Sequence, residues 1–486
     1  MTAERTKSLR RLLPVAAVLF AAGCATVDFS RPGDPMAPYA PRLGFNPGPV
    51  THQIDRFLAS RTGRSGLLAS FGSTSPYMFS NDTGRFHACY YGKMGYLDDQ
   101  AFTYDLALAA MGYLLDGRAD RAEHILGALE KDFYLKKNGT YGIYNSYLVS
   151  SRIPVEDLGM GGDGDRMHAG PTLWVALAAL NHMKLERNTR FLEFTLDIVE
   201  WCRSELTYFH FPDGERGAIS MGMGWGPDWR KIFSTEHNVD YFAVLQMLLQ
   251  VYRESPEDVR NIFRAKKVDD VWLADEMDHI GRWLKELAFN PEDYCFRAGY
   301  NEFGPDKLRI LDGTSWGLGG IGPENFEAWG IDLDRLVEST EKYFGSTYTL
   351  PNGEVLHGFD ITDPDGYERA RAPLFWFEGT GQQIIAYAEL SRYFARKGDE
   401  PRARKYAAKA VDYTRSMHRF SAYYRLNGVL PYMSIRPEPG AIVKTLKWEW
   451  EIPRGKNDEM WVGSMSSTMW FLYCVHGFFN PMKWSI

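Results

Sequence analysis

The chain has 486 residues, of which 24% are charged and 14% aromatic, and its formal net charge at pH 7 is −7. An acidic chain of this kind is not expected to bind nucleic acid or to hold a polyanionic substrate by bulk charge. The sequence contains no phosphate-binding loop, dinucleotide fingerprint, zinc-protease helix or serine-hydrolase elbow, so those enzyme classes are not predicted.

The cysteines form no metal-binding pattern. Cys89, Cys202, Cys295 and Cys474 are widely spaced and fit no zinc or iron–sulfur motif. Both disulfides and buried thiols are compatible with an exported chain. We expect no metal ion and no cofactor. The one alternative is a calcium loop at residues 161–165, where Asp and Gly alternate.

Residues 1–23 are predicted to be a bacterial lipoprotein signal peptide. A basic start precedes an apolar stretch over residues 12–22, which is too short to span a membrane. Residues 19–24, Leu-Phe-Ala-Ala-Gly-Cys, resemble a lipobox and imply lipidation of Cys24, for example by palmitate. Ala25 is not the aspartate associated with retention at the inner membrane, so the outer membrane, facing periplasm or cell surface, is the expected location. An ordinary secretory signal is the alternative.

The segment after Cys24 is predicted to be a tether. Residues 24–50 contain six prolines, a composition typical of semi-rigid linkers. Cleavage before Cys24 would remove four basic residues and one acidic residue, which changes the net charge from −7 to −10. No further linker follows, so residues 51–486 are predicted to form a single domain.

The rest of the chain alternates two kinds of helix. A helix that is apolar on every face is expected to be buried, whereas one with an apolar stripe at i, i+3, i+4 and i+7 lies at the surface. Ala122, Ile125, Leu126 and Leu129 form one such stripe, and Ala403, Tyr406, Ala407 and Ala410 form another. The apolar helices are predicted at residues 101–115, 172–183, 236–252, 314–321, 379–394 and 464–479.

Six apolar helices, each paired with an amphipathic one, predict an all-α (α/α)6 toroid. An inner ring of apolar helices inside an outer ring of amphipathic ones buries the apolar surface of every helix. The spacing of the pairs is about twice the roughly 34 residues of tetratricopeptide repeats, which are the structural alternative. Small strands or loops are expected at the mouth.

The loops before the inner helices are predicted to converge, because all inner helices of a toroid begin at the same end. These loops carry carboxylates and tryptophans, and aromatic rings are suited to stacking on sugars. The expected mouth residues are Asp98, Asp99, Asp163, Asp165, His168, Glu236, His237, Asp240, Asp312, Glu378, Trp225, Trp316, Trp376 and Trp461.

The start of the third inner helix is the strongest candidate site. Ser234 or Thr235 is the expected N-cap, and Glu236 lies in the first turn. Glu236 and Asp240 are four residues apart and therefore share a helix face. His237 and Tyr241 form a second pair beside them. The alternative interpretation is that Glu236 caps the helix end and that His237 is a structural core histidine.

The helix pairs, the acidic mouth and two motifs resemble the six-hairpin glycosidase superfamily over residues 52–480. The motifs are Ser-Thr-Glu-His-Asn-Val-Asp at residues 234–240 and Trp-Phe-Glu-Gly-Thr-Gly-Gln at residues 376–382. The resemblance implies a glycoside hydrolase, in most members inverting, or a polysaccharide lyase on a related toroid. It does not assign catalytic residues.

Glycoside hydrolysis requires one carboxylic acid and a second carboxylate. We predict Glu236 as the acid, because apolar neighbours should raise its pKa. The candidate bases, in order, are Asp165, Glu378 and Asp240, although Asp240 could instead tune Glu236. The candidate substrate-binding residues are His237, Asp163, Asp99, Trp225, Trp316, Trp376 and Tyr241.

Two other functions stay open at this stage. The first is a polysaccharide lyase, with Tyr241 or His237 as the base and Asn238 neutralising a uronate. The acidic mouth disfavours it, because lyases of acidic glycans usually have basic clefts. The second is a non-catalytic lipoprotein that binds a poly- or oligosaccharide or belongs to an exopolysaccharide-export complex. It would share the anchor and the aromatic residues but would not need paired carboxylates.

Overall fold

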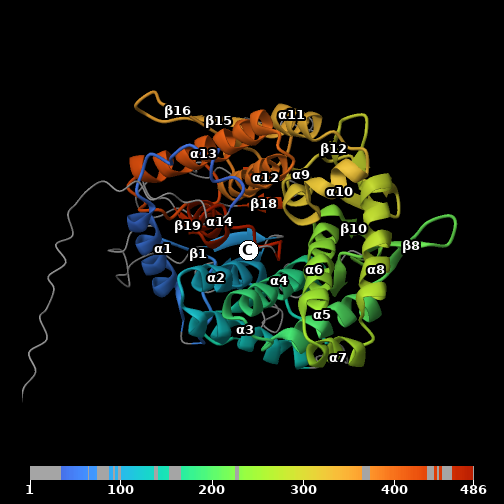
Figure 1. Cartoon of the computed structure of the whole chain (residues 1–486). Helices are drawn as coiled ribbons and strands as arrows, with labels where there is room; N and C mark the ends of the chain where they lie inside the picture. The colour runs from blue at the N-terminus through green and yellow to red at the C-terminus, as the bar shows by residue number, and fades with distance from the viewer. Residues whose placement is uncertain are drawn as a thin grey trace, which may run out of the picture.

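Six buried helices form a closed ring in the computed structural model of the chain, and further helices surround them (Figure 1). The structure describes residues 34–63, 65–73, 87–90, 93–96, 100–135, 141–152, 166–224, 229–363, 373–434, 443–445, 448–450 and 462–484. Around the ring, α2 contacts α4, α4 contacts α6, α6 contacts α9, α9 contacts α12, α12 contacts α14, and α14 contacts α2. The chain is therefore an (α/α)6 toroid, as predicted.

The inner helices are those that are apolar on every face. Every residue of α14 is buried, and in α4 the buried residues extend almost without a break from Ala169 to Lys184. Such helices can only be accommodated with neighbours on all sides. They are α2 (Thr103–Leu115), α4 (Ala169–Glu186), α6 (Thr235–Glu254), α9 (Asp312–Trp316) with its π-helical continuation (Gly317–Ile321), α12 (Phe377–Arg396) and α14 (Met465–Val475).

The outer helices bury a single face. In α3 the buried residues include Ala122, Ile125, Leu126 and Leu129, which confirms the predicted stripe. The second predicted stripe is likewise buried, in α13. The outer helices are α1 (Pro47–Arg61), α3 (Ala119–Tyr134), α5 (Leu192–Glu205), α7 (Glu257–Ala265), α8 (Asp270–Trp283), α10 (Pro323–Ala328), α11 (Leu333–Phe344) and α13 (Glu400–Tyr423).

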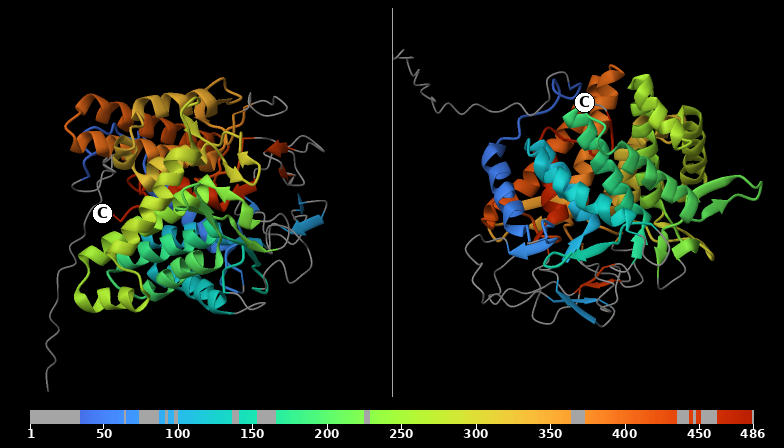
Figure 2. Two further views of the ribbon diagram at one scale, coloured as in Figure 1. Left: turned by 90° about the vertical axis from the view of Figure 1, so that its right-hand side faces the viewer. Right: turned by 90° about the horizontal axis from the view of Figure 1, so that it is seen from below.

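Short antiparallel strands gather mainly at the end of the ring where the inner helices begin (Figure 2). Strands β4, β6, β10 and β19 each lead directly into an inner helix. The pairs are β1 (Phe71–Ser73) with β19 (Val462–Ser464), β2 (His87–Tyr90) with β3 (Lys93–Tyr96), β4 (Gln100–Phe102) with β5 (Ser146–Leu148), β6 (Arg166–His168) with β9 (Gly222–Gly224), β7 (Tyr208–His210) with β8 (Arg216–Ile219), β10 (Phe233–Ser234) with β13 (Gly299–Asn301), β13 with β14 (Gly304–Pro305), β11 (Phe289–Asn290) with β12 (Cys295–Phe296), β15 (Gly345–Thr349) with β16 (Val355–Phe359), and β17 (Val443–Thr445) with β18 (Trp448–Trp450).

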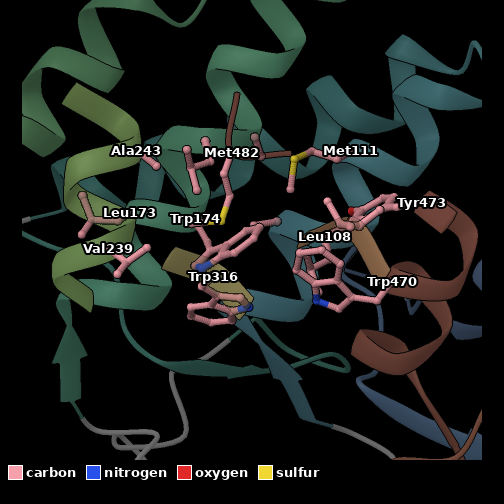
Figure 3. Packing of buried hydrophobic residues seen from close by; sticks show 14 of the residues in the cluster. Leu108, Met111, Leu173, Trp174, Val239, Ala243, Trp316, Trp470, Tyr473 and Met482 are labelled. Carbon is pink, nitrogen blue, oxygen red and sulfur yellow. The ribbon is translucent and has the colours of Figure 1, made fainter. Parts of the chain in front are cut away.

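The C-terminal segment closes the other end of the ring. The Asn480 amide donates to the carbonyl of Gly319 at 3.0 Å, and the Asn181 amide donates to the carbonyl of Pro481 at 2.7 Å. Met482 is 1% exposed and reaches toward Trp174 in the centre of the ring (Figure 3). A Cβ at Gly320 would lie 2.8 Å from the Met482 methyl carbon, so this glycine is needed for the close approach.

The N-terminal boundary of the domain differs from the prediction. Within the predicted tether, Met36 and Leu43 are 1% and 5% exposed, and Asn46 caps α1. Asp34 forms an ion pair with Arg392 at 2.8 Å. A proline-rich segment still packs against the domain when the apolar residues between its prolines can be buried there. The described part of the predicted tether therefore belongs to the domain, while residues 24–33 lie outside the described residues.

Cys202, Cys295 and Cys474 are buried free thiols, which settles the open question for these three. Among the helices that the structure describes, none combines the length and apolarity needed to cross a bilayer.

Candidate active site

The motif at residues 234–240 builds the start of α6 and holds the loop before it. The Ser234 hydroxyl accepts from the backbone N–H of His237 at 3.4 Å and acts as the predicted N-cap. The Asn238 side chain accepts from the N–H of Ile219 at 2.8 Å and donates to the carbonyl of the same residue at 3.0 Å. Asn238 therefore fixes strand β8 to the helix.

Carboxylates from four inner helices meet at the mouth. Glu236 lies in the first turn of α6, Asp312 begins α9, Glu378 lies in the first turn of α12, and Asp105 in that of α2. These groups interact: besides burial, the charge of Glu378 raises the pKa values of Glu236 and Asp105, and the charges of Glu236 and Glu378 raise that of Asp312. The four helices therefore bring the four carboxylates together, as the predicted convergence required.

Burial is the main cause of the raised pKa values. Desolvation first, and then the Glu378 charge, raise the pKa of Glu236 to about 8. Burial also raises the pKa of Asp105 to about 8 and that of Asp312 well above its usual range. Glu236 retains partial contact with solvent, whereas Asp105, Asp312 and Glu378 are at most 8% exposed. A carboxyl that is protonated near pH 7 and accessible is suited to general acid catalysis.

Glu378 has the most hydrogen-bond partners of the four carboxylates. Burial raises its pKa to about 7, but hydrogen bonds with Ser466 and Tyr104 oppose this rise. The Gln382 amide also donates to Glu378 Oε1 at 3.4 Å. Because donors stabilise the charged form, Glu378 is the first of these carboxyls to ionise as the pH rises.

Asp240 lies one turn deeper on the same face of α6. It is fully buried, and neither carboxylate oxygen has a hydrogen bond of normal geometry within the described part of the chain. Desolvation and the charge of Glu236 raise its pKa well above the usual range, although the nearby Trp174 indole opposes the shift. These effects favour the neutral form of Asp240, which fits the role of tuning Glu236 better than that of a base.

Aromatic rings, among them those of Trp174, Trp316 and Trp470, lie close together in the centre of the ring of helices (Figure 3). The ring centroids of Trp174 and Trp316 are 5.5 Å apart, and Tyr104 packs edge-on against Trp174 at 5.2 Å. Trp316 and Trp376 are 3% and 2% exposed. They therefore stiffen the wall of the site, and the structure offers little of either ring as a stacking surface.

Two of the predicted binding residues are held by contacts outside the carboxylate cluster. The Tyr241 hydroxyl donates to Glu276 of α8 at 3.2 Å, so Tyr241 points toward the outer ring. The His237 imidazole lies 3.2 Å from the carbonyl of Met221, and burial lowers its pKa to about 4. Its contacts are those of a structural core histidine, which was the alternative interpretation. Asp99, Asp163, Asp165, Trp225, Trp461 and Cys24, and the calcium alternative at residues 161–165, lie outside the described residues.

Two residues of the site were not predicted from the sequence. Asp105 and Tyr104 are consecutive residues at the start of α2, and neither was named as a candidate. The available signal was their position, because a carboxylate occupies the first turn of α2 just as it does in α6, α9 and α12. The described residues contain no group of three or more His, Cys, Asp or Glu side chains placed to hold a metal ion.

No protein-family model and no curated protein matches the sequence. Solved structures share the fold. A family 76 glycoside hydrolase from a bovine strain of Bacteroides thetaiotaomicron superposes with a TM-score of 0.50 at 9% identity, over 88% of this chain and 76% of its own. A family 76 mannosidase from B. thetaiotaomicron gives a TM-score of 0.50 at 11% identity, over 88% and 98%. A cellobiose 2-epimerase from Bacillus thermoamylovorans gives 0.50 at 10% identity, over 79% and 90%.

Proposed function

We propose that the protein is a glycoside hydrolase that acts on a poly- or oligosaccharide. The observation that carries the proposal is the carboxylate cluster, in which Glu236 is protonated and Glu378 is closest to ionisation near pH 7. Two carboxyls with different protonation states are what glycoside hydrolysis requires. The solved structures of similar fold include hydrolases of glycans, which supports the same reaction class.

In the proposed reaction, Glu236 donates its proton to the glycosidic oxygen as the bond to the anomeric carbon breaks. Glu378 removes a proton from a water molecule whose oxygen forms the new bond to that carbon. The protons balance, because one carboxyl loses a proton while the other gains one. Attack by water on the opposite face of the sugar gives inversion at the anomeric carbon.

The hydrogen bonds of the α6 motif count against a lyase. The residues that a lyase would need, His237, Asn238 and Tyr241, are engaged with Met221, Ile219 and Glu276. None of the described side chains that shift the pKa values of Glu236, Asp312 or Glu378 is a cation that could neutralise a uronate.

The test is product release from a panel of neutral and acidic polysaccharides. We expect new reducing ends without absorbance of unsaturated uronates, and proton NMR of the first product should show the inverted anomer. Absorbance of unsaturated uronates that persists in Glu236→Gln would instead indicate a lyase. An isomerised sugar without cleavage would indicate an epimerase. Binding without any turnover would indicate a glycan-binding lipoprotein.

We also propose that the protein is anchored to the outer membrane through lipid on Cys24. The lipobox-like segment supports the anchor, and Asp34 suggests its direction. Asp34 pairs with Arg392, which lies about 21 Å along α12 from Glu378 at 1.5 Å per residue. The chain would then leave the toroid at the end remote from the carboxylates, so that the mouth would face away from the lipid.

Labelling with radioactive palmitate tests the anchor. We expect the wild type to incorporate label and to sediment with membranes, because acyl chains bury many methylene groups in lipid. Cys24→Ser should abolish both. An unlabelled, soluble wild type would contradict the proposal.

A further inference from the structure

The hydrogen bonds of Tyr104 have a fixed direction. The indole Nε1 of Trp470 donates to the hydroxyl oxygen of Tyr104 at 2.8 Å. An indole N–H is only a donor, so the tyrosine oxygen must be the acceptor. The single hydrogen of the hydroxyl is thus available for its other partner, the carboxylate of Glu378. The donors run from Trp470 through Tyr104 to Glu378.

Packing holds this chain of donors in place. Trp470 is 1% exposed, and α14 approaches α12 so closely that a Cβ at Gly381 would lie 2.6 Å from the Trp470 Cβ. Tyr104 packs on its other side against Trp174 and Trp316, with centroid distances of 5.2 and 6.1 Å. The neighbouring rings therefore restrict the position of the Tyr104 side chain. This explains the second glycine of the motif at residues 376–382.

We propose that Tyr104, oriented by Trp470, is a positioning residue that holds the Glu378 carboxylate in place as the base, with Glu236 as the acid. The proposal rests on the hydrolase function proposed above. Its basis is the unequal distribution of donors. Glu378 has hydrogen bonds with Tyr104, Ser466 and Gln382, whereas Oδ1 of Asp312 has no partner among the described residues. Glu378 therefore has more hydrogen-bond partners for a negative charge than Asp105, which has Ser70, and than Asp312.

The first test is the pH dependence of kcat/KM. The base must be ionised and the acid protonated, so wild-type activity should fall below about pH 7, where Glu378 takes up a proton, and above about pH 8, where Glu236 loses one. Tyr104→Phe removes one donor to a charged group, which should raise the acidic limb by about one pH unit and leave the alkaline limb in place. Trp470→Phe should also move the acidic limb to higher pH, but by less than Tyr104→Phe.

A matched control separates this effect from general loss of packing. Tyr473 is a buried tyrosine on the same helix as Trp470, and its hydroxyl donates to the carbonyl of Leu108 at 2.6 Å. Tyr473→Phe removes a buried hydroxyl without touching Glu378, so its pH profile should match the wild type. An unchanged acidic limb in both Tyr104→Phe and Trp470→Phe would overturn the proposal.

The second test does not depend on the substrate. Carbon-13 NMR of glutamate-labelled protein, with the Glu378 resonance assigned through Glu378→Gln, measures the titration directly. We expect a midpoint near 7 in the wild type and a higher one in Tyr104→Phe. A shifted midpoint in a protein that cleaves no glycan would refute the hydrolase and uphold the role of Tyr104 toward Glu378. An unshifted midpoint in an active enzyme would refute that role alone.

Discussion

Replacing Glu236 with glutamine is expected to reduce kcat on the preferred glycan by about 10²- to 10⁴-fold, the range that a positioned general acid contributes. Glutamine keeps the size of the side chain but cannot give a proton to the leaving oxygen. KM should change little, because the proton transfer occurs only in the transition state. Initial rates of reducing-end release at several substrate concentrations measure both constants.

The same substitution is expected to stabilise the fold at alkaline pH. Burial and the charge of Glu378 raise the pKa of Glu236 from 4.5 to about 8 in the folded protein. The folded state therefore binds a proton that the unfolded state has lost, so this group lowers stability progressively as the pH rises from about 4.5 to 8. Glu236→Gln removes that penalty, and its melting temperature should exceed the wild-type value more at pH 8.5 than at pH 5.

Glu254→Gln is the matched control. Glu254 ends the same helix, is exposed, and accepts a hydrogen bond from Gln250 at 3.0 Å. It lies about 27 Å along the helix from Glu236 at 1.5 Å per residue. Its replacement should leave kcat and the pH dependence of stability unchanged. An active Glu236→Gln enzyme would remove Glu236 from the role of acid.

Periodicity predicted the architecture because burial leaves a direct trace in sequence. The stripe in α3 and the uniformly apolar α14 identify outer and inner helices without further information. The convergence of Glu236, Asp312 and Glu378 follows from the shared direction of the inner helices, so it was predictable from the same pattern.

The orientation of individual side chains was not predictable. In α6, buried on all sides, Asp240 and Tyr241 are adjacent in sequence, yet Asp240 interacts with Glu236 and Tyr241 contacts Glu276 on the outer ring. Adjacent residues of a helix point about 100° apart. In a helix that is apolar on every face, the pattern does not say which direction is inward. The hydrogen bond from Trp470 to Tyr104 joins residues 366 positions apart, so no local sequence pattern predicts it.

The ion pairs at the closed end of the ring are expected to give the largest stability effect outside the site. Arg392 pairs with Asp34 at 2.8 Å and with Glu389 at 2.7 Å, and it also donates to the carbonyls of Gly477 and Phe478. Asp34 and Glu389 are each 6% exposed in their side chains. One guanidinium therefore joins the N-terminal segment, α12 and the C-terminal segment.

The pKa of Glu389 shows how strongly this cluster is coupled. Burial alone would raise that pKa, but the charges of Lys483 and Arg392, and their hydrogen bonds, lower it from 4.5 to about 2. A carboxyl with a lowered folded-state pKa stabilises the fold above its unfolded pKa. That contribution should be complete above about pH 4.5 and should decline as the pH falls toward 2.

Arg392→Met is expected to lower the free energy of unfolding by about 3–5 kcal/mol, because it takes the Arg392 cation from buried Asp34 and leaves Glu389 with Lys483 alone. Urea denaturation at pH 7 measures the loss, and the deficit should shrink as the pH approaches 2, where Glu389 takes up a proton.

Arg396→Met, one turn further along α12, is the matched control. Arg396 pairs with Glu324, but the two side chains are 46% and 48% exposed. Breaking that pair should cost less than about 1 kcal/mol, since water replaces the lost partner. Equal losses in the two variants would show that the Arg392 cluster does not hold the chain ends to the ring.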